Sequence, residues 1–219
     1  MRTGVSAALL VLLAPLSVAA QLSASATKPR DPGLPPPRHI HDSRFGLSFD
    51  VPAGWNVTER DGDVSTYALD ARTAAGNSRM REVAQLAFNP FPASTFAGAL
   101  FYFSVTPHAT QRSCADQASA QAPHRPETVS IGGLPFTHGY DEHGTICTEA
   151  RDQVYTALHR GTCLRFDLVL NTFCGGDVSG VRSMSDREIA AVQKRLEDIL
   201  ATVRFDASGT APPATASVK

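Results

Sequence analysis

The stretch from Cys147 to Cys174 constrains the fold most, because two alternating runs of similar length meet at Arg160-Gly161. Alternation of apolar and polar residues is typical of half-buried strands, and a pair ending in glycine suits a two-residue turn. With that turn, Tyr155 faces Phe166, and Cys147 falls opposite Cys174. The sequence therefore predicts a long antiparallel hairpin with a cysteine at each open end.

The four cysteines limit the possible disulfides. Cys163 and Cys174 lie on one predicted strand, where an advance of about 3.3 Å per residue separates them by more than about 30 Å and excludes a bridge between them. The hairpin register favours Cys147 with Cys174, which leaves Cys114 with Cys163 to join a short predicted helix to the sheet. A β-bulge would shift this register. A cysteine metal site is the rival interpretation, but no C-x-x-C spacing occurs.

Residues 1–20 have the pattern of a secretory signal peptide. A basic start precedes the apolar run Val5 to Leu16, and small residues follow where a signal peptidase would cut. The apolar run is shorter than the roughly 20 residues that span a bilayer, so we expect no membrane-spanning segment. An even number of cysteines also suits an exported chain. We therefore expect the mature protein to be periplasmic or extracellular.

The rest of the chain divides into a linker, one domain and a tail. Prolines among small and basic residues predict a semi-extended linker over 21–41, and Ala, Ser, Thr and Pro predict a disordered tail over 207–219. The domain, 42–206, is long enough to build its own core, and no cofactor is implied. Lys and Arg number 20 against 21 Asp and Glu, so no basic face for nucleic acid is evident. A monomer is compatible with the sequence.

Strand patterns come early in the domain and a helix pattern closes it. Short strands are expected on both sides of the turn at Pro52-Ala53-Gly54, at Val64 to Leu69 and at Ala99 to Val105, and a short helix at Thr110 to Gln121. Ser185 and Glu188 fit a capping box before an amphipathic helix that ends near Val203. This order predicts an α+β fold in which an antiparallel sheet has flanking helices and a long C-terminal helix.

The segment Phe45-Gly46-Leu47-Ser48-Phe49-Asp50-Val51-Pro52-Ala53-Gly54-Trp55 resembles the opening strand, proline turn and tryptophan of the PsbP-like superfamily, which includes PsbP and DcrB-like envelope proteins. The strand entry Ile131 to Phe136 and the closing helix into Val203-Arg204-Phe205 are similar in placement. The resemblance implies a PsbP-like sandwich with a binding or assembly role, usually without catalysis. The four cysteines depart from that pattern, and no functional residue carries over.

The densest group of metal-ligating residue types is His138-Gly139-Tyr140-Asp141-Glu142-His143. Imidazole and carboxylate together suit zinc or a similar ion, so His138, Asp141 and His143 are the candidate ligands if the segment forms a turn, with Asp152 or His159 as a further one. A solvated loop is the alternative. His39-Ile40-His41-Asp42 is a similar group in the predicted linker.

Two further features bear on function. Arg165 and Asp167 are expected on the strand face opposite the leucines, where with Thr156 they either pair in water, which is the commoner outcome, or line a groove. Ser179 lies in a glycine-rich segment that lacks the G-x-S-x-G spacing of a nucleophile elbow. We therefore expect an exported, non-catalytic domain with two disulfides that binds a small ligand or an envelope protein. The alternative is a metal-dependent or hydrolytic enzyme that uses the 138–143 segment.

Overall fold

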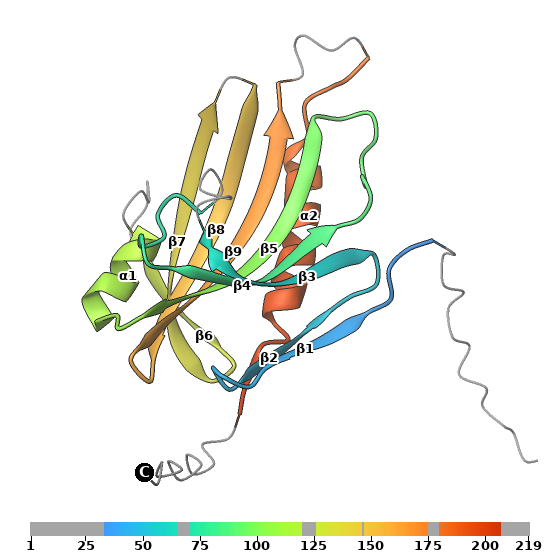
Figure 1. Ribbon diagram of the computed structural model, residues 1–219. Helices are drawn as coiled ribbons and strands as arrows, with labels where there is room; N and C mark the ends of the chain where they lie inside the picture. Colours follow the sequence, from blue (N-terminus) through green and yellow to red (C-terminus); the bar gives the residue numbers. More distant parts are fainter. Residues whose placement is uncertain (1–32, 65–70, 120–125, 146, 175–179, 207–219) are drawn as a thin grey trace, which may run out of the picture. The chain divides into compact units, whose positions relative to one another are not determined.

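The computed structural model describes residues 33–64, 71–119, 126–145, 147–174 and 180–206 (Figure 1). The predicted signal peptide, most of the linker, the tail and Ser179 lie outside them. The elements are β1 (Arg38–Asp42), β2 (Leu47–Val51), β3 (Trp55–Asp63), β4 (Arg79–Leu86), β5 (Phe96–Pro107), α1 (Gln111–Ser119), β6 (Glu127–Ile131), β7 (Leu134–Thr145), β8 (Thr148–His159), β9 (Thr162–Phe173), α2 (Asp186–Leu200) and β10 (Arg204–Phe205). The predicted α+β class with a C-terminal helix is confirmed. In the described ranges, neither helix is long and apolar enough to cross a membrane.

Two antiparallel sheets organise these strands. The larger has the order β3-β4-β5-β9-β8-β7-β6, and the smaller has the order β1-β2-β10. Since β1 begins at Arg38, the last residues of the predicted linker belong to the sheet. They pair with β2 from Arg38 opposite Val51 to Asp42 opposite Leu47. No apolar alternation indicates a strand here because, of the two buried residues Ile40 and Asp42, only Ile40 is apolar.

The predicted hairpin is β8–β9, and its register is confirmed. Tyr155 lies opposite Phe166, and the pairing runs from Thr148 with Phe173 to His159 with Thr162. The turn residues Arg160 and Gly161 have φ angles of 49° and 77°. Positive φ at both positions gives the turn type whose twist matches that of the two strands.

One face of the large sheet carries the main core. Phe166 is fully buried there, and its ring centroid lies 5.6 Å from that of Phe101 and 5.2 Å from that of Phe103. The small sheet contributes Phe49, and α2 contributes a stripe of buried residues that includes Leu196. The predicted capping box at Ser185 is present, so α2 begins where the sequence indicates.

The opposite face of the large sheet is covered by α1 and by residues 71–78. The close approach of α1 depends on Gly139 of β7, because a Cβ atom there would lie 1.6 Å from the carbonyl oxygen of Ala118. Cys114 of α1 is joined to Cys163 of β9 by a disulfide. Charged side chains of β7, β8 and β9 are enclosed beneath this cover.

Candidate functional site

The candidate metal residues lie in strand β7 and not in a turn. Because side chains alternate along a strand, His138 points to one face of the sheet, and Asp141 and His143 point to the other. His138 Nδ1 lies 3.0 Å from Glu127 Oε1, and its ring stacks on Tyr155 at 4.3 Å between centroids. His143 Nδ1 lies 3.2 Å from Asp141 Oδ2.

The strand therefore separates the three candidate ligands into a single histidine and a histidine–aspartate pair. Asp152 lies opposite Asp141 in the β7–β8 register, on the same face. His159 is at the far end of β8, where its ring lies 5.6 Å from that of Phe205. Within the described ranges, no group of three or more His, Cys, Asp or Glu residues has the geometry to hold a metal ion.

The expectation that Arg165 and Asp167 are exposed is wrong, since both side chains are fully buried. Arg165 Nε donates to both Asp167 carboxylate oxygens at 2.9 Å, and its Nη2 also pairs with Asp167. Its Nη1 donates to Thr73 Oγ1 at 2.9 Å and to the carbonyl oxygen of Gln117 at 3.4 Å. The strand pattern correctly placed both residues opposite the leucines, but it could not show that a helix covers that face.

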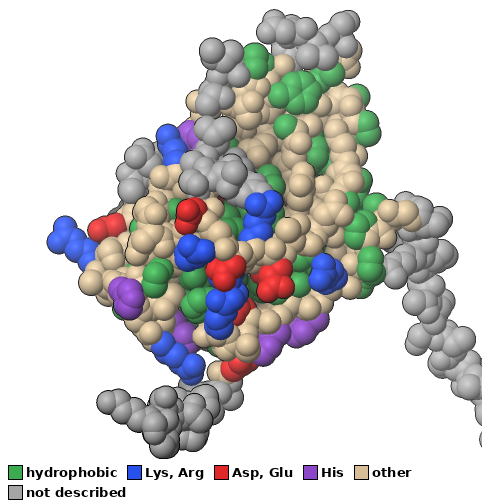
Figure 2. All heavy atoms as spheres, in the orientation of Figure 1, with side chains coloured by type: hydrophobic (Ala, Val, Ile, Leu, Met, Phe, Trp, Pro, Cys, Tyr) green, Lys and Arg blue, Asp and Glu red, His purple; other side chains and the backbone are tan. Residues whose placement is uncertain are grey.

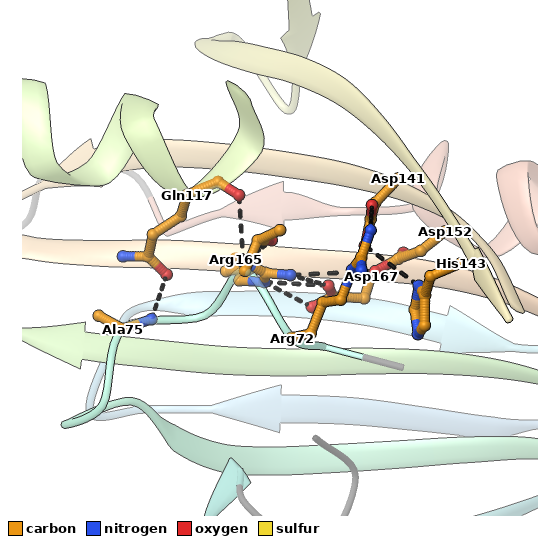
Figure 3. A network of polar contacts seen from close by, with 9 residues as sticks. Arg72, Ala75, Gln117, Asp141, His143, Asp152, Arg165 and Asp167 are labelled. Atoms are coloured by element: carbon orange, nitrogen blue, oxygen red, sulfur yellow. Dashed lines mark hydrogen bonds and ion pairs between the residues drawn. The ribbon is translucent and has the colours of Figure 1, made fainter. Parts of the chain in front are cut away.

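Residues from the covering segments complete this network (Figure 3). Arg72 Nε and Nη2 donate to the two oxygens of Asp141, each at 2.6 Å. Gln117 of α1 accepts a hydrogen bond from the backbone N–H of Ala75 at 3.3 Å. The network thus joins α1, residues 71–78 and three strands. Its bidentate arginine contacts fix orientation as well as charge.

Asp152 is the least well satisfied member of this network. Its side chain is 1% exposed, its Oδ2 lies 3.9 Å from Arg165 Nη2, and neither carboxylate oxygen has a hydrogen-bond partner in the described structure. Burial, and then the neighbouring Asp167 carboxylate, raises the pKa of Asp152 well above its usual value. Burial opposes the charge of Arg165, but Asp167 raises the pKa of this guanidinium above its ordinary value. In this enclosed group of one arginine and several carboxyl groups, the shift favours the protonated form of Asp152.

Covalent and ionic contacts therefore hold the same cover in place. The Cys114–Cys163 bridge, with Cα atoms 5.4 Å apart, fastens α1 to β9 two residues from Arg165. Close packing at Gly139 and the Arg72–Asp141 pair fix the β7 side. The enclosed charges act as a clamp between the cover and the sheet.

Cys147 and Cys174 lie at the open end of the β8–β9 hairpin, as the register predicts. The backbone N–H of Cys174 donates to the carbonyl oxygen of Cys147 at 3.4 Å. Cys147 has a φ of 64°, which turns the chain at this point. The described structure does not bridge these two cysteines, so a disulfide between them stays a prediction.

An open polar pocket of about 360 Å³ lies on another part of the domain. It is lined by all of β1, by Ser43 and Arg44 of the following turn, by Glu59 of β3, and by Arg81 and Glu82 of β4. Charged side chains of both signs gather over the β3–β4 region in the view of Figure 2, with histidines beside them. A β-bulge between Met80 and Glu82 inserts Arg81 into the strand, so that adjacent residues line one pocket.

Sequence reasoning missed most of this pocket. His39 and His41 stood out, but in a segment that was expected to be a linker, and they pair with Asp50 at 2.7 Å and with Asp206 at 3.3 Å. Glu59 of β3 and Arg81 and Glu82 of β4 belong to two segments with weak strand alternation, and the bulge at Arg81 breaks the pattern in β4. Only the pairing of β3 with β4 brings Glu59 opposite Glu82.

No protein-family model matches the chain, and no curated protein matches it. Solved structures with a similar arrangement include a Bacteroides thetaiotaomicron protein at 13% identity and a TM-score of 0.42, over 80% of this chain and 51% of that one. The chain thus spans about half the length of that protein. Cyanobacterial PsbP (CyanoP) from Synechocystis is 11% identical with a TM-score of 0.45, over 82% of this chain and 98% of that one. LpqN of Mycobacterium tuberculosis, described as involved in cell envelope biogenesis, is 8% identical with a TM-score of 0.42, over 78% of this chain and 91% of that one. These structures are weakly similar in arrangement, and the resemblance of the chain to the PsbP-like superfamily stays a prediction from the sequence.

Proposed function

We propose that the chain is an exported, non-catalytic binding domain, stabilised by two disulfides, that works in the cell envelope or outside the cell. The bridge between Cys114 and Cys163 supports export, because disulfides persist in oxidising compartments and are rare in the cytosol. The signal-peptide pattern of residues 1–20 points the same way. The second bridge joins Cys147 and Cys174 at the end of the hairpin.

The pocket beside β1, β3 and β4 carries the binding role. Its volume of about 360 Å³ falls at the lower end of the range of small-ligand sites. Its lining comes largely from paired β-strands, with a bulge at Arg81, and groups held on strands keep their geometry better than groups on loops. The pocket is therefore a preorganised polar site on a frame that a disulfide and a buried ionic clamp reinforce.

Export is tested by producing the full chain, with its own first residues, in a bacterial host and separating the periplasm and medium from the cytoplasm. We expect the protein outside the cytoplasm, shortened near Ala20, with no thiol that alkylates before reduction and four that alkylate after it. Retention in the cytoplasm with intact N-terminal residues would contradict export. Thiols that alkylate without reduction would contradict the two-disulfide account.

Binding is tested separately on the purified mature protein. Charged and neutral small molecules are screened for a rise in unfolding temperature, and the same screen is run on a Ser43→Phe variant, in which a bulky ring enters the pocket from its exposed turn. A ligand that stabilises the original protein but not the variant supports a role for the pocket. If every stabilising ligand acts equally on both proteins, the pocket is not the binding site.

A further inference from the structure

The positive side chains of the pocket already have partners. Arg81 Nη2 lies 2.9 Å from Asp42 Oδ2, and Arg81 Nη1 lies 3.2 Å from Asp61 Oδ1. Arg44 Nη1 also lies 3.4 Å from Asp61, and Arg38 Nη1 donates to the carbonyl oxygen of Val57 at 3.3 Å. Carboxylates therefore compensate Arg81 and Arg44, whereas the contact described for Arg38 is to a neutral carbonyl oxygen.

Two carboxylates of the pocket, Glu82 and Glu59, are less well compensated by neighbouring groups than its arginines. Glu82 is only 8% exposed, and its Oε2 is buried with no hydrogen-bond partner among the described residues. Glu59 lies directly opposite it across the β3–β4 pair. Like charges at such positions destabilise a sheet, and a buried acceptor without a donor is also costly. Burial and then the Glu59 carboxylate raise the pKa of Glu82 to about 7.

A cationic hydrogen-bond donor placed between Glu82 and Glu59 would offset the repulsion between the two carboxylates and would give Glu82 Oε2 a partner. A metal ion does not suit the arrangement, since no group of His, Cys, Asp and Glu in the described ranges has the geometry for one. A pocket of about 360 Å³ is also larger than a bare ion needs. Ammonium and guanidinium groups carry several N–H donors, so that one group can donate to two carboxylates at once.

We propose that this pocket binds an organic cation whose ammonium or guanidinium group donates to both Glu82 and Glu59. The inference rests on the proposed binding function and specifies its ligand chemistry. The cation belongs either to a small free amine or to a lysine or arginine side chain of a partner protein. The chemistry recognised is the same in both cases, and the test separates the two sources.

The test is isothermal titration calorimetry on the mature protein with two probes. Agmatine represents a free amine, and a Gly-Arg-Gly peptide with blocked ends represents a protein side chain. We expect binding of at least one probe, weakened about tenfold or more by Glu82→Gln and by Glu59→Gln, because each removes a charged hydrogen-bond acceptor. If only agmatine binds, the site is assigned to a free amine. If the peptide binds more tightly than agmatine, the site is assigned to a side chain of a partner protein.

The matched control is Asp198→Asn, which removes an exposed carboxylate that pairs with Lys194 on α2, outside the pocket. It should leave the affinity for either probe unchanged, and unfolding curves establish that all variants fold. The proposal is overturned if neither probe binds, if Glu82→Gln binds as tightly as the original protein, or if Ca²⁺ binds in a Glu82-dependent way while the probes do not. In that case, a ligand of another class that stabilises the original protein but not Ser43→Phe would still support the proposed binding function, while the organic-cation inference would be wrong.

The pH dependence of binding provides a second readout. Glu82 faces Glu59 on β3, Arg81 on β4, and Arg38, His39, His41 and Asp42 on β1, with Arg44 in the turn. An organic cation favours the ionised carboxylate, so affinity should rise between pH 6 and pH 8 and binding should release protons. The difference in proton release between the original protein and Glu82→Gln is the contribution of Glu82. Undiminished proton release in Glu82→Gln would contradict the assignment.

Discussion

Arg165→Met removes the one guanidinium at the centre of the buried network while keeping much of its volume. Arg165 is fully buried and pairs with Asp167, which is also fully buried. Loss of one partner from such a pair typically costs about 3 to 5 kcal/mol, because it leaves an uncompensated charge in the interior. Hydrogen bonds to Thr73 and Gln117 are lost as well. We expect the free energy of unfolding to fall by about 4 kcal/mol at neutral pH, a large part of the stability of a typical domain.

Urea unfolding followed by circular dichroism, with the disulfides intact, measures this loss. The matched control is Arg151→Met on β8, whose ion pairs with Glu142 and Glu149 are partly exposed, and it should cost less than about 1 kcal/mol. Arg165→Met combined with Asp167→Leu should recover part of the loss, since both charges are then absent. Equal losses of unfolding free energy for Arg165→Met and Arg151→Met would contradict the role of the buried ion pairs as a clamp.

The same variant has a predicted pH dependence. Without the guanidinium, whose charge lowers the pKa of Asp152, that raised pKa rises further, so the folded state binds more protons than the unfolded chain. Stability then increases as the pH falls, and the deficit of Arg165→Met should shrink towards acidic pH. A deficit that stays constant from neutral to acidic pH would show that lost packing, and not charge, causes it.

Three further changes test the enclosed face. Gly139→Ala places a methyl group against a backbone carbonyl of α1 and should lower the free energy of unfolding by about 1 to 3 kcal/mol or more. The control is Gly98→Ala, because a Cβ atom at Gly98 has no neighbour within 4 Å, and equal effects of the two changes would contradict the close packing. Cys114→Ser with Cys163→Ser opens a loop of 49 residues and should cost about 4 kcal/mol in urea unfolding by the chain-entropy model, and an unchanged midpoint would contradict a stabilising role. Asp152→Asn imitates the protonated acid. Above the pKa that Asp152 has in the unfolded chain, the stability of this variant relative to the original protein should therefore increase with pH, by at most about 1.4 kcal/mol per pH unit. Parallel curves of stability against pH for the two proteins would be evidence against the raised pKa of Asp152.

Local patterns were sufficient to predict several elements. Alternation and the Arg160-Gly161 turn predicted the β8–β9 register, because a tight turn and one buried face together allow a single alignment. Ser185 and Glu188 predicted the start of α2, because a capping box involves only neighbouring residues. Both signals act within short stretches of chain.

Features that depend on distant segments could not be predicted in this way. Arg165 has the same alternation whether its face is open to water or covered by α1, so its burial became clear only from the packing of that helix. Histidines 138 and 143 looked convergent because the segment was interpreted as a turn, and strand geometry sends them to opposite faces. The pairing of Glu59 with Glu82 likewise depends on the meeting of two strands across a bulged register.

The most direct test of the whole account is a disulfide map of the protein recovered from outside the cytoplasm, by mass spectrometry of peptides digested without reduction. The account predicts one linked pair containing Cys114 and Cys163 and another containing Cys147 and Cys174, both of which separate on reduction. Cys114 and Cys163 found as free thiols in the folded protein, or each linked to a different cysteine, would contradict it.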